Sequence, residues 1–138
     1  MVTNGLKIVS FWSYLCLLTY ELLLKNPWVI LGDKIATHPP LDTHTVVASG
    51  ILHIGAFGIL GFLWSWAYAD RNESQRVRYA LWLIAYCGVS EVLQSFVPNR
   101  WPSGEDILFN VFGLFTGVLV FYLSGRYSQP NPEVAASI

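Results

Sequence analysis

The chain has 138 residues, of which 54% are hydrophobic and only 12% are charged, and its mean hydropathy is +0.46. Soluble domains carry about 25% charged residues, so this composition excludes an ordinary soluble domain and predicts an integral membrane protein. The net charge of −1 balances 8 basic against 9 acidic residues, with no basic or acidic tract. We therefore predict the lipid bilayer as the surroundings of the protein and no nucleic acid as a partner.

Four apolar segments follow one another along the chain, and each approaches the length of about 20 residues that a helix needs to cross the hydrocarbon layer. They predict an all-α integral membrane protein with four transmembrane helices in a small bundle. We expect a single domain over residues 1–138, with a long loop over 25–45, where prolines break the helix, and a flexible tail over 124–138. The helices are expected at roughly 8–24, 46–69, 77–97 and 107–123.

The basic residues predict the orientation of the four helices. An even number of spans puts both termini on one side, together with the link at residues 70–76. That side collects five basic residues and the opposite side three, so the positive-inside rule predicts a multi-pass cell-membrane protein with both termini in the cytoplasm. The five are Lys7, Arg71, Arg76, Arg78 and Arg126, and the three are Lys25, Lys34 and Arg100.

Six polar residues converge on one depth in this arrangement. Glu91 lies roughly 9 Å below the outer end of the third helix, and His53 lies roughly 10 Å below the outer end of the second, at 1.5 Å per residue. Spacings of three and four residues put the polar groups of each helix on one face, which we expect to point inward. The six predicted binding residues are His53, Glu91, Gln94, Arg100, Asp106 and Asn110.

Small residues continue these polar faces. Gly113 and Gly117 follow Asn110 at spacings of three and four residues. This small-residue spacing is typical of helices that pack closely in lipid. We therefore predict that Gly113 and Gly117 mediate helix packing.

The cysteines and the polar residues give no sign of a metal or cofactor site. Cys16 and Cys87 both lie in apolar runs and are expected to be buried, reduced thiols, without a disulfide or zinc spacing. The carboxylates and His53 lack a compact ligand motif, and Arg100 nearby disfavours additional positive charge. We predict no cofactor and no metal.

The same residues carry a resemblance to a known family. The run "EVLQSFVPNRWPSGEDILFNVFGLFTG" resembles the signature of VanZ-like membrane proteins, and "ILHIGAFGILGFLW" resembles their second helix, where His53 takes the place of the family's histidine. The usual Asp-Lys pair before that histidine is replaced by Ser49 and Gly50. The resemblance covers roughly residues 46–123. The matching residues are Glu91, Gln94, Arg100, Asp106, Asn110, Gly113 and Gly117.

This resemblance implies a small four-helix membrane protein of the cell envelope. The family is named for a member linked to resistance against glycopeptide antibiotics such as teicoplanin. Architecture is therefore implied more directly than activity, and protein partners are not predicted.

The acids and amides each allow a structural and a functional interpretation. Glu91 is either a hydrogen-bonding acid that holds helices together or a binding or catalytic group, the usual starting hypothesis for an ionisable residue in a span. Asp106 either caps the fourth helix or takes part in the site. Gln94 and Asn110 by themselves are typical of hydrogen bonds between helices.

Arg100 and His53 leave the same choice open, and two functions remain. Arg100 is either a salt-bridge partner or a phosphate ligand, and His53 is either a buried hydrogen-bonded residue or a functional one. The first function is binding or modification of a lipid-linked or cell-wall component in an outer polar pocket. The alternative is a membrane-embedded enzyme acting on a lipid phosphate or acyl group, with Glu91 or Asp106 as general base. No nucleophile motif is present, so we rank binding first.

Overall fold

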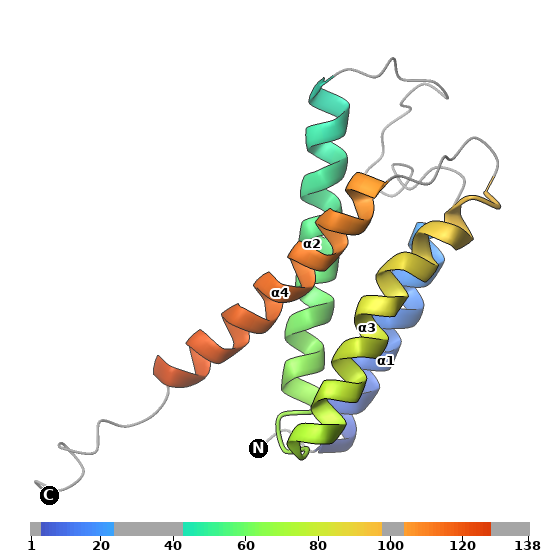
Figure 1. Cartoon of the computed structure of the whole chain (residues 1–138). Helices are drawn as coiled ribbons and strands as arrows, with labels where there is room; N and C mark the ends of the chain where they lie inside the picture. The colour runs from blue at the N-terminus through green and yellow to red at the C-terminus, as the bar shows by residue number, and fades with distance from the viewer. Residues whose placement is uncertain (1–3, 24–42, 98–103, 128–138) are drawn as a thin grey trace, which may run out of the picture.

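A computed structural model describes residues 4–23, 43–97 and 104–127 (Figure 1). Within these ranges the protein is entirely helical, and each predicted segment corresponds to one helix. The all-helical prediction is therefore confirmed for the part of the chain that the structure describes. The four helices are α1 (Asn4–Leu22), α2 (Thr43–Ala67), α3 (Glu73–Gln94) and α4 (Gly104–Tyr127).

The helices begin earlier than the apolar runs because polar residues can form their first turns. The Asn72 side chain accepts a hydrogen bond from the backbone N–H of Gln75 at 2.9 Å, so α3 begins at Glu73 rather than at Val77. Such a cap satisfies one of the free amides at a helix start. α4 carries Glu105 and Asp106 in its first turn, where acidic groups suit the helix dipole. Ser103, which precedes this helix, lies outside the described residues.

The helix ends also differ from the predicted ones. α3 ends at Gln94 rather than at Val97. α4 continues to Tyr127, past the predicted end at Leu123, and the hydroxyl of Ser124 donates to the Phe121 carbonyl at 2.8 Å within this last part. Polar serine thus fits inside a helix that hydropathy alone would end.

α2 lies at the centre of the arrangement. It contacts α1 on one side and forms its most extensive interface with α4. Figure 1 shows α4 crossing α2 and then diverging from α1 and α3, which lie side by side. α4 also contacts α3, so α2 and α4 form a close pair against which α1 and α3 pack.

The α2–α4 contact brings two backbones together at glycines. A Cβ atom at Gly113 would lie 2.5 Å from the carbonyl oxygen of Ile54, and one at Gly117 would overlap the carbonyl of Gly58. A Cβ atom at Gly61 would likewise overlap the carbonyl of Leu114 on α4. Only glycine permits so close an approach.

The opposite side of α2 is held by larger side chains. The rings of Phe57 and Tyr86 pack with centroids 6.1 Å apart, and Phe57 is fully buried. The Tyr14 hydroxyl donates to the carbonyl of Ala56 at 2.9 Å. The hydroxyls of Tyr86 and Thr19 lie 2.8 Å apart, which ties α3 to α1.

Among the described residues, two helices are long and apolar enough to cross a membrane by themselves. These are the segments Ser49–Ala67 of α2 and Gly104–Gly125 of α4. α1 and α3 carry more polar residues but also expose large apolar side chains. Among those more than half exposed are Leu6, Val9 and Leu17 on α1 and Val77, Leu81 and Val92 on α3.

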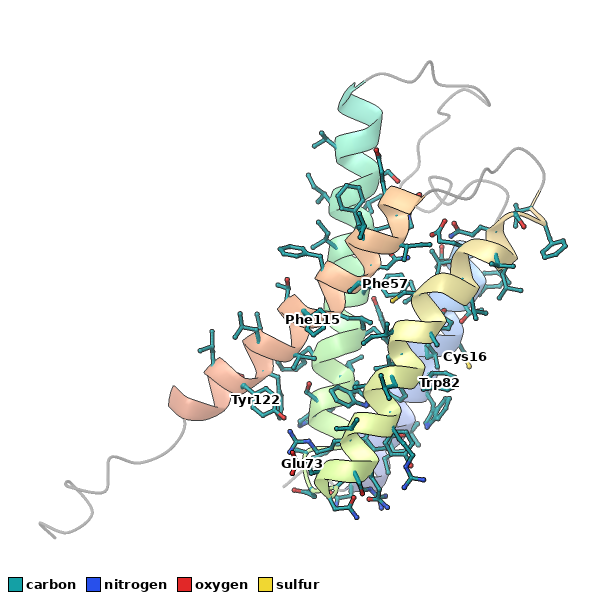
Figure 2. All side chains as sticks on the ribbon, viewed as in Figure 1. Cys16, Phe57, Glu73, Trp82, Phe115 and Tyr122 are labelled. Carbon is teal, nitrogen blue, oxygen red and sulfur yellow. The ribbon has the colours of Figure 1, made fainter. Side chains whose placement is uncertain are left out.

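The prediction for the cysteines is half wrong. Cys87 is fully buried, but Cys16 is exposed and lies on the side of α1 away from α2 (Figure 2). The buried face of α1 is formed by Phe11, Leu15 and Leu18, a stripe that Cys16 does not share. An apolar helix in lipid has apolar residues on every face, so an apolar neighbourhood in the sequence does not distinguish buried from exposed positions.

A candidate polar site between α2, α3 and α4

Four of the six predicted site residues are buried inside the apolar bundle. Glu91 and Gln94 are each 2% exposed, His53 is 7% exposed and Asn110 is fully buried. We call these four residues the polar cluster. Asp106 is half-buried in the first turn of α4, and Arg100 lies outside the described residues.

The polar groups of α2 and α3 lie at the same level because the two helices are antiparallel. A short link joins them at one end (Figure 1), and Phe57, on the side of α2 that faces α3 (Figure 2), packs against Tyr86. His53 lies one turn beyond Phe57, and Glu91 lies one turn beyond Cys87, about 6 Å in each case. Both side chains therefore lie about one turn from the Phe57–Tyr86 contact, toward the ends of α2 and α3 that are away from the link.

A hydrogen bond joins α2 to α4 at this level. Nδ1 of His53 lies 2.7 Å from Oδ1 of Asn110, and with the amide oxygen facing the ring the imidazole N–H is the donor. Gly113, one turn deeper on α4, touches the backbone of Ile54 beside His53. The close helix contact thus sets the distance between imidazole and amide.

Asn110 has hydrogen-bonding capacity left over. Its Nδ2 atom is buried, and no described residue accepts a hydrogen bond from it. Most buried polar atoms in folded proteins have a partner. An unpartnered amide N–H beside a histidine is therefore a donor that a bound group can use.

On α3 the carboxylate of Glu91 has a partner on its own helix. With its amide nitrogen turned toward the acid, Gln94 donates to both Oε1 and Oε2 of Glu91, at 3.3 Å each. The spacing of three residues places the two side chains on one face. Hydrogen bonds of this kind help to hold an ionisable group away from water.

The structure adds Ser90 to this region, a residue that no sequence motif indicated. Ser90 is 3% exposed, and its hydroxyl donates to the carbonyl of Cys87 at 2.9 Å. The thiol of Cys87 in turn lies 3.4 Å from the carbonyl of Leu83. A serine in an apolar helix carries no motif, although its position between Cys87 and Glu91 could have placed it on the buried face.

Position 50 departs from the family pattern for a reason that packing explains. A Cβ atom at Gly50 would lie 2.9 Å from the ring of Phe109 on α4. The lysine expected there from the family resemblance would therefore require that ring to move. In this chain the position serves helix packing.

The arrangement combines hydrogen-bond donors and acceptors in apolar surroundings. Carboxylate, imidazole and amide groups from three helices lie buried at one level, and together they offer both donors and acceptors of hydrogen bonds. Among residues 4–23, 43–97 and 104–127, no three His, Cys, Asp or Glu side chains gather to hold a metal ion.

These features define a small helical protein with two helices apolar enough to cross a membrane and a buried polar cluster, in the part of the chain that the structure describes. A sequence model of the VanZ/LLP1 family matches residues 11–125. The chain therefore belongs to the VanZ/LLP1 family, which confirms the predicted family and, together with the two apolar helices, indicates a membrane protein. The match includes most of α1, which the resemblance at residues 46–123 did not cover. No curated protein and no solved structure matches the chain.

Proposed function

We propose that this protein is a four-span protein of the cell envelope whose polar cluster binds a polar group of a lipid-linked or cell-wall component. The observation that carries the proposal is the burial of Glu91, which is 2% exposed within an apolar bundle. An ionisable residue inside a span costs on the order of 2.5–3.5 kcal/mol on insertion scales, and such residues commonly mark ligand sites. Binding of an envelope component would change how a glycopeptide antibiotic meets its target.

The donors and acceptors of the cluster support a ligand with hydroxyl, amide or phosphate groups. Nδ2 of Asn110 is a donor without a partner among the described residues, and the Glu91 carboxylate is an acceptor. Binding is favoured over catalysis because the nucleophile-type side chains beside the acid, Ser90 and Cys87, are directed at carbonyls of their own helix.

The four-span topology is supported by the dimensions and surfaces of α1 and α3. Their 19 and 22 residues correspond to about 28 and 33 Å at 1.5 Å per residue, close to the hydrocarbon thickness of about 30 Å. Their outward faces expose large apolar side chains, which a soluble protein rarely tolerates in such number. The basic residues favour cytoplasmic termini.

Cysteine labelling tests this topology. In a variant without Cys16 and Cys87, single cysteines at position 35 or 103 should react with a membrane-impermeant reagent added from outside. Cysteines at position 73 or 131 should react only after the membrane is opened. Labelling of position 73 from outside would overturn the orientation.

The decisive experiment for binding is the substitution Glu91→Gln, which keeps size and hydrogen-bonding capacity but removes the charge. We expect the variant to insert and to melt in detergent within a few degrees of the wild type. It should lose the lipid or cell-wall component that co-purifies with the wild type in native mass spectrometry, together with any teicoplanin phenotype of the expressing cells.

Glu73→Gln is the matched control, because Glu73 is an exposed acid on the same helix. It should retain both the bound component and the phenotype. A stable Glu91→Gln protein that also retains both would contradict a functional role for the charge and would leave Glu91 with a structural role only.

A further inference from the structure

A second site lies at the opposite end of α2 and α3 from the polar cluster. There the side chains of α1, α2 and α3 surround a cavity of about 420 Å³, within the range of about 300–1,000 Å³ that is usual for ligand pockets. We call it the aromatic cavity. Six aromatic rings line it: Phe11, Trp12, Trp64, Tyr68, Tyr79 and Trp82.

Contacts between the rings define the walls of this cavity. Trp12 of α1 meets Trp82 of α3, with centroids 6.1 Å apart, where α3 passes α1 (Figure 2). Tyr68, at the end of α2, packs against Phe11 at 5.6 Å and against Tyr79 at 4.8 Å. Because rings from all three helices support one another, the hollow between them is built into the fold.

The aromatic cavity is distinct from the polar cluster. Trp64 is eleven residues from His53 on α2, or about 16 Å along the helix, and Trp82 is nine residues from Glu91 on α3, or about 14 Å. A ligand in one site therefore does not occupy the other.

One cation lines the cavity. Arg78 on α3 is exposed, and no described residue forms an ion pair or a hydrogen bond with it. The neighbouring cations are engaged: Arg76 donates to the Tyr122 hydroxyl, and the Lys7 ammonium lies 5.9 Å from the centre of the Trp66 ring. Arg78 therefore combines two properties: it lines the cavity, which Arg71 at the same end does not, and it has no partner among the described residues.

We infer that the aromatic cavity holds an acyl chain of an anionic phospholipid whose phosphate pairs with Arg78. The apolar rings suit a hydrocarbon chain, and a guanidinium group binds phosphate through two parallel hydrogen bonds. Trp and Tyr rings also prefer the level of the lipid headgroups. Under the proposed topology this end faces the cytoplasmic leaflet, which carries the anionic lipids.

The acids at the same end do not oppose this pairing. Asp70 and Glu73 are exposed near the α2–α3 link, and neither lines the cavity. The lining therefore carries a single positive charge and no negative one, which complements an anionic headgroup better than a zwitterionic one.

Native mass spectrometry of the full-length protein in detergent tests this inference. The protein is titrated with phosphatidylglycerol and with phosphatidylcholine of the same acyl chains. We expect one phosphatidylglycerol to bind more tightly than phosphatidylcholine. Arg78→Gln should weaken phosphatidylglycerol binding about fivefold, the effect of about one arginine near a lipid phosphate, and should weaken phosphatidylcholine binding less, because the choline cation offsets the charge of its phosphate.

Arg71→Gln provides the matched control, because it removes the same charge from the same end but from a residue outside the cavity. It should bind phosphatidylglycerol like the wild type. Trp82→Ala tests the acyl-chain part: Trp82 is 48% exposed, so the variant should fold, yet it should bind both lipids at least about threefold more weakly because apolar contact is lost.

Three results would overturn the inference. They are equal affinity of the wild type for the two lipids, unchanged phosphatidylglycerol binding by Arg78→Gln, and equal weakening by Arg71→Gln and Arg78→Gln. None of them depends on the behaviour of Glu91→Gln, so this site and the proposed function of the polar cluster can fail separately.

Discussion

The two sides of α2 are packed in different ways. Toward α4, glycines such as Gly113 and Gly117 bring backbone against backbone, and the helices touch without intervening side chains. Toward α1 and α3, rings such as Phe57 and Tyr86 fill the space. α2 therefore packs against α4 through backbone atoms and against α1 and α3 through large side chains.

This difference explains where the two sites lie. Backbone contact leaves little freedom between α2 and α4, so His53 and Asn110 meet at a short distance, 2.7 Å. Packing between large rings cannot fill all the space between three helices, so the aromatic cavity remains. Close contact positions polar groups, whereas packing through large side chains leaves room for an apolar ligand.

The largest effect is expected where the glycine contact is broken. Gly117→Ala puts a methyl group into the carbonyl of Gly58, and two helix backbones must separate to admit it. We expect a loss of about 3 kcal/mol or more in the free energy of unfolding, at the upper end for overpacking. Thermal or denaturant unfolding in detergent would measure it.

Gly88→Ala is the matched control on α3, where no atom lies within 4 Å of the added methyl. There alanine should leave stability unchanged or raise it by up to about 1 kcal/mol, because it favours the helix more than glycine does. Equal losses at positions 117 and 88 would refute the backbone contact.

The next effect concerns the polar pair that this contact positions. His53→Ala and Asn110→Ala should each lower the free energy of unfolding by about 1–3 kcal/mol, since each leaves a buried partner unsatisfied. The double variant should lose less than the sum of the two single losses, and the difference should be at least about 0.5 kcal/mol. Asn110→Ala combined with Tyr20→Phe, at an exposed position on α1, should instead be additive. Additivity of the first pair would contradict the hydrogen bond.

A smaller effect is expected on the opposite side of α2. Tyr86→Phe keeps the ring contact with Phe57 but removes the hydrogen bond to Thr19 on α1. We expect a loss of about 0.5–1.5 kcal/mol, measured by unfolding in detergent. Tyr20→Phe, at a position that is 63% exposed, should change nothing, and a comparable loss there would show that the Tyr86 effect is not specific.

The smallest effect is expected at a buried serine whose hydrogen bond stays within its own helix. Ser65 is 4% exposed, and its hydroxyl donates to the carbonyl of Gly61 on its own helix at 3.0 Å. Ser65→Ala removes donor and hydroxyl together and leaves that carbonyl in the helix ladder. We expect a change within about 0.5 kcal/mol. A loss above 1 kcal/mol would mean that Ser65 has a partner on another helix.

The pattern of the sequence predicted more of the polar cluster than of the apolar contacts. Buried polar residues stand out in an apolar chain, so Glu91, Gln94 and Asn110 could be assigned to inward faces from their spacing. Cys16 was assigned wrongly, because an apolar residue in an apolar helix has no such contrast. The aromatic cavity had no signal either, since its tryptophans are equally typical of interfacial and packing positions.

By itself the sequence determined the helical class, the approximate positions of four helices and the family, because hydrophobic length and polar spacing are local properties of the chain. Only the tertiary structure decided which helices touch. It placed the Gly117 backbone against Gly58, joined His53 to Asn110 and left a hollow lined by rings of three helices. Such contacts depend on crossing angles and side-chain shapes from separate segments, and these are set when the helices pack together.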